Sequence, residues 1–182
     1  MTITEAQREM RARYVGGFFG QLVSGALWLL SASLAVWSTP RIAITTLVLG
    51  GVFIFPITEL LIRMTGARAR LSADNGLRQL GMQAAFVLPL SMPLVLPVGL
   101  YRLNWFYPAM TILVGAHYLP FVTLYGMRMF AALGGLLVGG GMLIAMYGSS
   151  RFGTAAWFTG AALLVFAVVG RVIAQRERNG VA

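Results

Sequence analysis

Long apolar runs separated by polar breaks dominate the hydrophobic pattern of this chain. Six runs stand out, each about 20 residues long, at 18–37, 42–62, 80–100, 105–125, 129–147 and 154–173. A helical run of this length crosses roughly 30 Å of hydrocarbon. Most of the breaks are short, so consecutive helices should be antiparallel neighbours. The pattern predicts an all-α, six-transmembrane-helix bundle in a single membrane domain, residues 1–182.

The segment before the first run, residues 1–17, is polar and charged. Thr4 and Gln7 match the spacing of a helix capping box, and Glu9 and Arg13 have the spacing of a favourable i,i+4 ion pair. Acidic residues interrupt the basic region that a cleavable signal would need. We therefore predict a short helix along the cytoplasmic interface that leads into the first span.

Composition and charge support a membrane protein and give its orientation. The chain is 58% hydrophobic and 10% charged, whereas soluble domains have about 45–50% apolar and about 25% charged residues. The connections between successive spans lie on alternate sides of the membrane. Three arginines fall on one side, at positions 41, 102 and 151. Eleven fall on the other, at positions 8, 11, 13, 63, 68, 70, 78, 128, 171, 176 and 178. The positive-inside rule then predicts that both termini are cytoplasmic. Topology also explains the net charge of +9, so no nucleic-acid partner is expected.

Missing residue types exclude several chemistries. The chain has no cysteine, and all 14 of its basic residues are arginine. Thiolate nucleophiles, iron–sulfur clusters and lysine Schiff bases are therefore excluded. Its one histidine, His117, could serve as an axial haem ligand, and only one acidic residue, Glu59, lies inside an apolar run. We expect no cofactor and no metal site, and we disfavour an enzyme.

The fourth run is the most polar of the six. Asn104, Thr111, Tyr118 and Tyr125 recur every seven residues, so they should lie on one helix face directed into the bundle. His117 lies beside that face near the middle of the span. An intramembrane histidine indicates a functional site by default. The alternative is a structural hydrogen bond between helices.

Prolines in the third and fourth runs suggest irregular backbone. Pro120 cannot donate to the carbonyl of Ala116, which predicts a kink and a cavity near His117. Three more prolines, Pro89, Pro93 and Pro97, recur every four residues in the third run. The carbonyls that they free could line a polar path or unwind the helix; the alternative is a bent helix.

Glu59 lies near the cytoplasmic end of the second run. An i,i+4 ion pair with Arg63 would anchor this helix end, and Gln83 lies at a similar depth as a candidate hydrogen-bond partner. The functional alternative is a proton or cation site at an inner vestibule.

Two glycine pairs have the G-x-x-x-G spacing that lets helices approach closely. Gly135 and Gly139 lie in the fifth run, while Gly16 and Gly20 lie at the start of the first. The pairs fit packing within the chain and an interface between chains equally well. We expect a homo-oligomer surrounded by membrane lipids.

Several sequence blocks resemble a family of uncharacterised bacterial membrane proteins of similar length. The blocks are the opening MTITEAQREMR, the stretch VSGALWL, the block YRLNWFYPAM and the block HYLPFVTLYG. The resemblance covers nearly the whole chain. It implies a multi-pass protein of the bacterial inner (cytoplasmic) membrane and supplies no activity, substrate or catalytic residue.

Three functional hypotheses follow. The first is a protein that binds or conducts a small solute, ion or lipid through a cavity between the third and fourth spans. Its candidate contacts are His117, Tyr118, Thr111, Tyr125, Glu59 and Gln83. The second is a non-catalytic membrane assembly or sensory protein held together by glycine packing. The third is an intramembrane enzyme or cofactor binder that uses His117.

Overall fold

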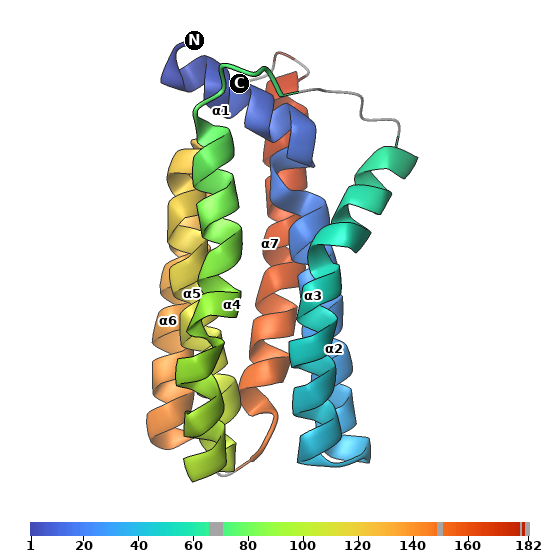
Figure 1. Ribbon diagram of the computed structural model, residues 1–182, viewed down its shortest axis with the longest axis vertical. Helices are drawn as coiled ribbons and strands as arrows, with labels where there is room; N and C mark the ends of the chain where they lie inside the picture. Colours follow the sequence, from blue (N-terminus) through green and yellow to red (C-terminus); the bar gives the residue numbers. More distant parts are fainter. Residues whose placement is uncertain (66–70, 149–150, 179, 181–182) are drawn as a thin grey trace.

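The computed structural model describes residues 1–65, 71–148, 151–178 and 180, and shows six long helices that run side by side (Figure 1). They are α2 (Phe18–Trp37), α3 (Pro40–Met64), α4 (Leu77–Tyr101), α5 (Phe106–Tyr125), α6 (Met129–Tyr147) and α7 (Thr154–Arg178). All six are long and apolar enough to span a membrane. The prediction of an all-α protein with six spans is confirmed. Arg68 and Arg70, which contribute to the arginine count, lie outside the described residues.

Three helices, α3, α4 and α7, extend beyond their apolar runs, and at the start of α3 and α4 polar side chains bond to the first amides. The hydroxyl of Thr39 accepts a hydrogen bond from the amide of Ile42, and Pro40 occupies the first turn of α3, where its missing amide costs nothing. At the start of α4, the side chain of Asn75 accepts a hydrogen bond from the amide of Leu77. Helix α7 continues past its apolar run to Arg178.

Helix α1 (Ile3–Tyr14) crosses one end of the bundle, and the last turn of α7 lies at the same end (Figure 1). The expected capping box of Thr4 and Gln7 is wrong, because the helix begins earlier and Thr2 is the capping residue. The amide of Thr2 donates to the Glu5 carboxylate over 2.7 Å, and the amide of Glu5 donates to the Thr2 hydroxyl over 3.3 Å. Gln7 instead donates to the backbone carbonyl of Thr123 in α5 over 2.8 Å.

Ionic and polar side chains of α1 attach it to four other segments. Glu9 accepts hydrogen bonds from Ser72 and Asn75 in the segment before α4. Arg11 forms an ion pair of 2.7 Å with Glu177 at the end of α7 and also donates to the carbonyl of Tyr125. Arg13 forms an ion pair of 2.5 Å with Glu59 of α3. The predicted pair of Glu9 with Arg13 is therefore wrong, since each side chain has a partner elsewhere in the fold.

Acidification tests the attachment at Glu9. Hydrogen bonds from Asn75 and Ser72 lower the pKa of the Glu9 carboxyl below its ordinary value of 4.5. A carboxyl with a lowered folded-state pKa contributes stability above its unfolded value, and the contribution is lost as pH falls through the folded pKa. We expect hydrogen exchange in α1, corrected for intrinsic rate, to become faster relative to α6 below pH 4.5. The variant Glu9→Gln should show a smaller pH dependence, and what remains comes from Glu5, whose carboxyl pKa is lowered by its hydrogen bonds with Thr2. A wild-type α1 that stays equally protected would contradict the assignment.

The helices pack in two groups joined by α7. Helix α2 contacts α3 and α7, while α5 contacts α4 and α6, and α7 contacts both α5 and α6. Over the described residues, α3 and α4 do not pack along each other, and Figure 1 shows them standing apart. This leaves a space whose walls come from α2 and α3 on one side and α4 and α5 on the other.

Close packing of α5 on α6 depends on glycines other than the expected pair. A Cβ atom on Gly115 would lie 2.8 Å from the backbone nitrogen of Val138, and one on Gly134 would lie 2.9 Å from the carbonyl oxygen of Gly115. In contrast, nothing described lies within 4 Å of a Cβ placed on Gly135 or Gly139. That pair takes no part in packing against the described residues, and an interface between chains at these glycines stays a prediction.

The second predicted pair, Gly16 with Gly20, is split between two environments. Gly16 has a φ of 63° in the turn η1 (Val15–Gly17) between α1 and α2, and its backbone approaches Gly170 of α7. A side chain on Gly16 would be strained by the left-handed backbone and would meet the Gly170 carbonyl. Gly20 lies inside α2, where a Cβ would meet nothing described within 4 Å. The two glycines therefore do not form one helix–helix contact.

Candidate functional site

A cavity of about 740 Å³ lies between the α2–α3 pair and the α4–α5 pair. Its wall is mostly apolar, and the character of the residues that line it changes along the bundle axis. Nearest α1 are Arg13, Tyr14, Arg78 and Tyr125; next come Gln21, Ser24, Thr58, His117 and Tyr118; farthest are Leu27, Trp28, Leu47, Val48, Met92, Met110 and Val114. The cavity thus changes from charged, through polar and uncharged, to apolar.

Three polar side chains in the middle of the cavity carry atoms without a hydrogen-bond partner in the part of the chain that the structure describes. They are both amide atoms of Gln21 on α2, the hydroxyl of Thr58 on α3 and Nδ1 of His117 on α5. Gln21 is 2% exposed and Thr58 is 9% exposed. Leaving a buried polar group unpaired costs about 1–3 kcal/mol, so such groups are rare in folded proteins. Three residues with such atoms line one cavity, which makes this cavity the candidate site of the bundle. We call Gln21, Thr58 and His117 the polar triad.

The cavity is closed at the end farthest from α1. There Ser31 donates to the carbonyl of Ala43 over 2.9 Å and shares a hydrogen bond of 2.7 Å with the hydroxyl of Tyr107. The Tyr107 ring packs on Trp28 and Phe152, with ring centroids 6.2 and 4.9 Å away. Among the described residues, none from the last turns of α2 or α4 beyond this layer lines the cavity. The cavity is therefore blind at that end.

The side of the cavity between α3 and α4 is open, because the lining residues Val52, Phe55 and Met82 are 70%, 60% and 64% exposed. Figure 1 shows the half of α3 nearest α1 leaning away from α4. Pro56 lies inside α3 and has no amide to donate to the carbonyl of Val52, which loosens the helix there. In a membrane this opening would face lipid, so a ligand could enter sideways from the bilayer.

The predicted site residues of the fourth span are divided between the cavity and the packing of helices. His117, Tyr118 and Tyr125 line the cavity. Thr111 does not: it is fully buried, shares a hydrogen bond of 2.7 Å with Thr159 of α7 and donates to the carbonyl of Tyr107. Asn104 is exposed in the turn η2 (Leu103–Trp105) before α5, so it does not share the inward face.

Glu59 also has a different neighbour from the one predicted. Its carboxylate forms an ion pair of 2.5 Å with Nη2 of Arg13, so the expected pairing with Arg63 is wrong. Gln83 is exposed on α4 and does not line the cavity, and its expected hydrogen bond with Glu59 is also wrong. The physical reason is that α3 turns Glu59 toward α1, while α4 stands apart from α3.

The prolines affect the cavity less than their spacing suggested. Helix α4 stays continuous through all three of its prolines, and of these only Pro89 lines the cavity, together with Ala85. Helix α5 is also continuous through Pro120. The expected cavity beside His117 is present, but Ala116 and Pro120 are not part of its wall. Of the three residues whose carbonyls the prolines free, Ala85 and Pro89 line the cavity and Pro93 does not, and a polar path along these carbonyls stays a prediction.

Six polar or charged lining residues were missed in the sequence: Arg13, Tyr14, Gln21, Ser24, Thr58 and Arg78. For Gln21, Ser24 and Thr58 the available signal was a polar side chain inside an apolar run, which in a membrane has to find a partner or a cavity. Gln21 and Thr58 carry this signal as clearly as His117 does. Their convergence could not be read from spacing, because they lie on three different helices.

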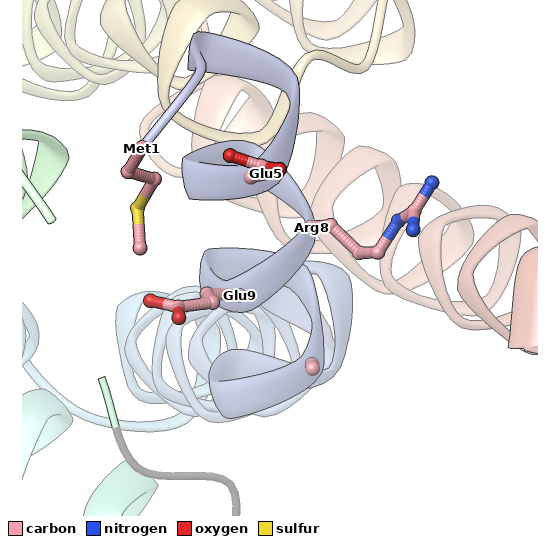
Figure 2. A pocket seen from close by; sticks show the side chains of 5 residues that line it. Met1, Glu5, Arg8 and Glu9 are labelled. Atoms are coloured by element: carbon pink, nitrogen blue, oxygen red, sulfur yellow. The ribbon is translucent and has the colours of Figure 1, made fainter. Parts of the chain in front are cut away.

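A second hollow, on the outer side of α1, is not a candidate site. It is lined by Met1, Glu5, Arg8, Glu9 and Ala12. Figure 2 shows the Arg8 side chain pointing away from those of Met1 and Glu9, so the charged groups do not converge. Glu5 already bonds to Thr2, and Glu9 already bonds to the segment before α4.

Comparison with known proteins identifies a family but no function. No curated protein and no solved structure matches this chain. A family model, described as a family of unknown function (DUF7010), matches residues 3–172, which is nearly the whole chain and includes every helix that lines the cavity. This multi-pass membrane protein therefore belongs to the DUF7010 family of unknown function.

Proposed function

We propose that the protein binds a lipid-like amphiphile in the cavity between α2, α3, α4 and α5. The observation that carries this proposal is the polar triad: its three residues line a mostly apolar cavity, and each has a buried polar atom without a partner among the described residues. A ligand with hydrogen-bonding groups and an apolar body would satisfy both features. Binding sites for small molecules commonly combine an apolar wall with a few convergent polar groups.

The blind end of the cavity favours binding over conduction. A conducting path has to be continuous from one side of the membrane to the other. Here the layer formed by Ser31, Tyr107 and Trp28 stands between the cavity and the far end of the bundle. The lateral opening between α3 and α4 instead offers access from the lipid phase.

The orientation follows from charge. Arginines concentrate at the end where α1 lies, so we assign that end to the cytoplasmic side of a bacterial inner membrane. The cavity then opens within the cytoplasmic leaflet. Its charged end lies at headgroup depth and its apolar end lies near the bilayer centre.

Trp28 offers a direct test, because it is 2% exposed and lies in the apolar end of the cavity. The other three tryptophans, Trp37, Trp105 and Trp157, are exposed on the outside and can be replaced by phenylalanine. In this single-tryptophan protein, a phosphatidylglycerol with a brominated acyl chain should quench Trp28 when the chain enters the cavity. Quenching is titrated in detergent against the fraction of brominated lipid.

Replacing the polar triad should weaken this binding without harming the fold. Each of Gln21→Leu, Thr58→Val and His117→Leu removes hydrogen bonds worth about 0.5–1.5 kcal/mol, or about 2- to 13-fold in affinity, and the triple variant should lose at least about 10-fold. Thermal stability without added lipid should stay the same or rise, because unpaired buried polar groups are removed. Thr45→Val, on the exposed side of α3, is the matched control. Unchanged quenching in the triple variant would overturn the proposal.

A further inference from the structure

The distribution of charge in the cavity wall identifies the head of the ligand. This inference rests on the proposed function and narrows its ligand class. We propose that the ligand is an acyl-chain amphiphile with an anionic head, a phosphate or a carboxylate, held at the α1 end of the cavity by Arg78 beside Tyr14 and Arg13.

The cavity wall carries positive charge only. Among the described residues that line it, Arg13 and Arg78 are charged and none is acidic. Glu59 neutralises Arg13 through their ion pair. Arg78 forms no ion pair with any described residue and is exposed at the start of α4. Within the described part of the wall, Arg78 is therefore the guanidinium without an ion-pair partner, and a cationic head would meet no acidic side chain.

A guanidinium suits the proposed head in shape as well as in charge. Its planar array of donors bonds phosphate and carboxylate groups through two parallel hydrogen bonds. The hydroxyl of Tyr14 lines the same end of the cavity and can add a donor. Beyond it, the polar triad lies where the ester or hydroxyl groups of such a ligand would follow the head.

The length of the cavity matches one leaflet of a bilayer. On α4 the lining residues extend from Arg78 to Met92, and a rise of about 1.5 Å per residue places them about 21 Å apart. A bilayer with its headgroups is about 40–45 Å thick, so one leaflet is about 20–22 Å. A lipid that enters through the gap between α3 and α4 could therefore keep its depth and orientation.

Competition between headgroups tests the inference. The single-tryptophan protein is loaded with brominated phosphatidylglycerol and titrated with unbrominated phosphatidylglycerol, palmitate or phosphatidylcholine. We expect either anionic competitor to restore Trp28 fluorescence at about tenfold or more lower concentration than zwitterionic phosphatidylcholine. Comparing phosphatidylglycerol with palmitate decides whether the natural head is a phosphate or a carboxylate.

Variants that change the charge of the cavity wall provide a second test of the anionic head. Arg78→Gln should weaken binding of brominated phosphatidylglycerol by about 10- to 100-fold and remove the preference over phosphatidylcholine. Arg63→Gln removes an exposed arginine at the same end of the bundle that does not line the cavity, and should change neither. Glu59→Gln frees Arg13 from its carboxylate, so it should increase the preference for anionic heads.

The outcomes separate this inference from the proposed function. If brominated phosphatidylcholine quenches Trp28 as well as brominated phosphatidylglycerol does, and Arg78→Gln has no effect, the anionic head is wrong while lipid binding stands. If no brominated lipid quenches Trp28 in the wild-type background, the proposed function itself fails. Normal thermal unfolding of Arg78→Gln excludes misfolding as the cause of lost binding.

Discussion

The double variant Gly20→Phe and Gly51→Phe should abolish quenching of Trp28 by brominated phosphatidylglycerol. Both glycines line the cavity, from α2 and α3 respectively. A Cβ atom placed on either meets nothing described within 4 Å, so the first atom of a new side chain enters free space rather than the packed core. Two phenyl rings would occupy volume that an acyl chain needs. Replacing glycine inside a helix also favours helix formation, so the fold should persist.

The matched control is Gly135→Phe with Gly139→Phe on α6. These glycines also have open space at their Cβ positions, but they do not line the cavity. Binding should be unchanged in the control and undetectable in the cavity-filling variant, with similar thermal stability for both. Full quenching in the cavity-filling variant would place the lipid on the outer surface of the bundle and contradict binding inside it. Loss of self-association in the control alone would support the predicted interface at Gly135 and Gly139.

The variant Gly115→Leu should prevent stable packing of α5 against α6. A Cβ atom there would lie 2.8 Å from the backbone nitrogen of Val138 and 2.9 Å from the carbonyl oxygen of Gly134. Backbone atoms cannot move aside as the end of a side chain can, so the two helices would have to separate. Overpacking of a core typically costs about 1–3 kcal/mol, and we expect a loss of at least about 3 kcal/mol here.

Unfolding in mixed micelles of increasing sodium dodecyl sulfate content measures this loss, with helicity followed by circular dichroism. Gly115→Ala adds one methyl group and should fall between the wild type and Gly115→Leu. Gly135→Leu adds the same side chain to the open face of α6 and should keep or raise the unfolding midpoint, because leucine favours helix more than glycine does. Equal midpoints for Gly115→Leu and Gly135→Leu would show that the α5–α6 contact does not depend on the missing side chain.

The membrane spans can be predicted from this sequence because each one depends only on its own residues and on the lipid around it. A run of about 20 apolar residues forms a spanning helix whatever its neighbours are, since its backbone groups must be satisfied within the helix. Two observed helices, Phe18–Trp37 and Met129–Tyr147, coincide with their apolar runs. The structure differs where capping chemistry extends a helix past the apolar run, as Thr39 and Pro40 do for α3.

Pairings between residues close in sequence were the least reliable expectations. Glu59 lies four residues from Arg63, yet it bonds to Arg13. Glu9 lies four residues from Arg13, yet it bonds to Ser72 and Asn75. An i,i+4 pair on a helix surface is worth only about 0.2–0.5 kcal/mol, so partners on other helices readily replace it.

The sequence alone determines six apolar helices and the charged helix before them, because hydrophobicity and capping act over short distances. His117 also stands out from sequence, since a histidine in an apolar run is conspicuous. The cavity is a property of the tertiary structure. It exists because α3 and α4 do not pack along each other, and it brings Gln21, Thr58 and His117 together from three helices. No spacing within one helix determines that convergence, which depends on how whole helices pack.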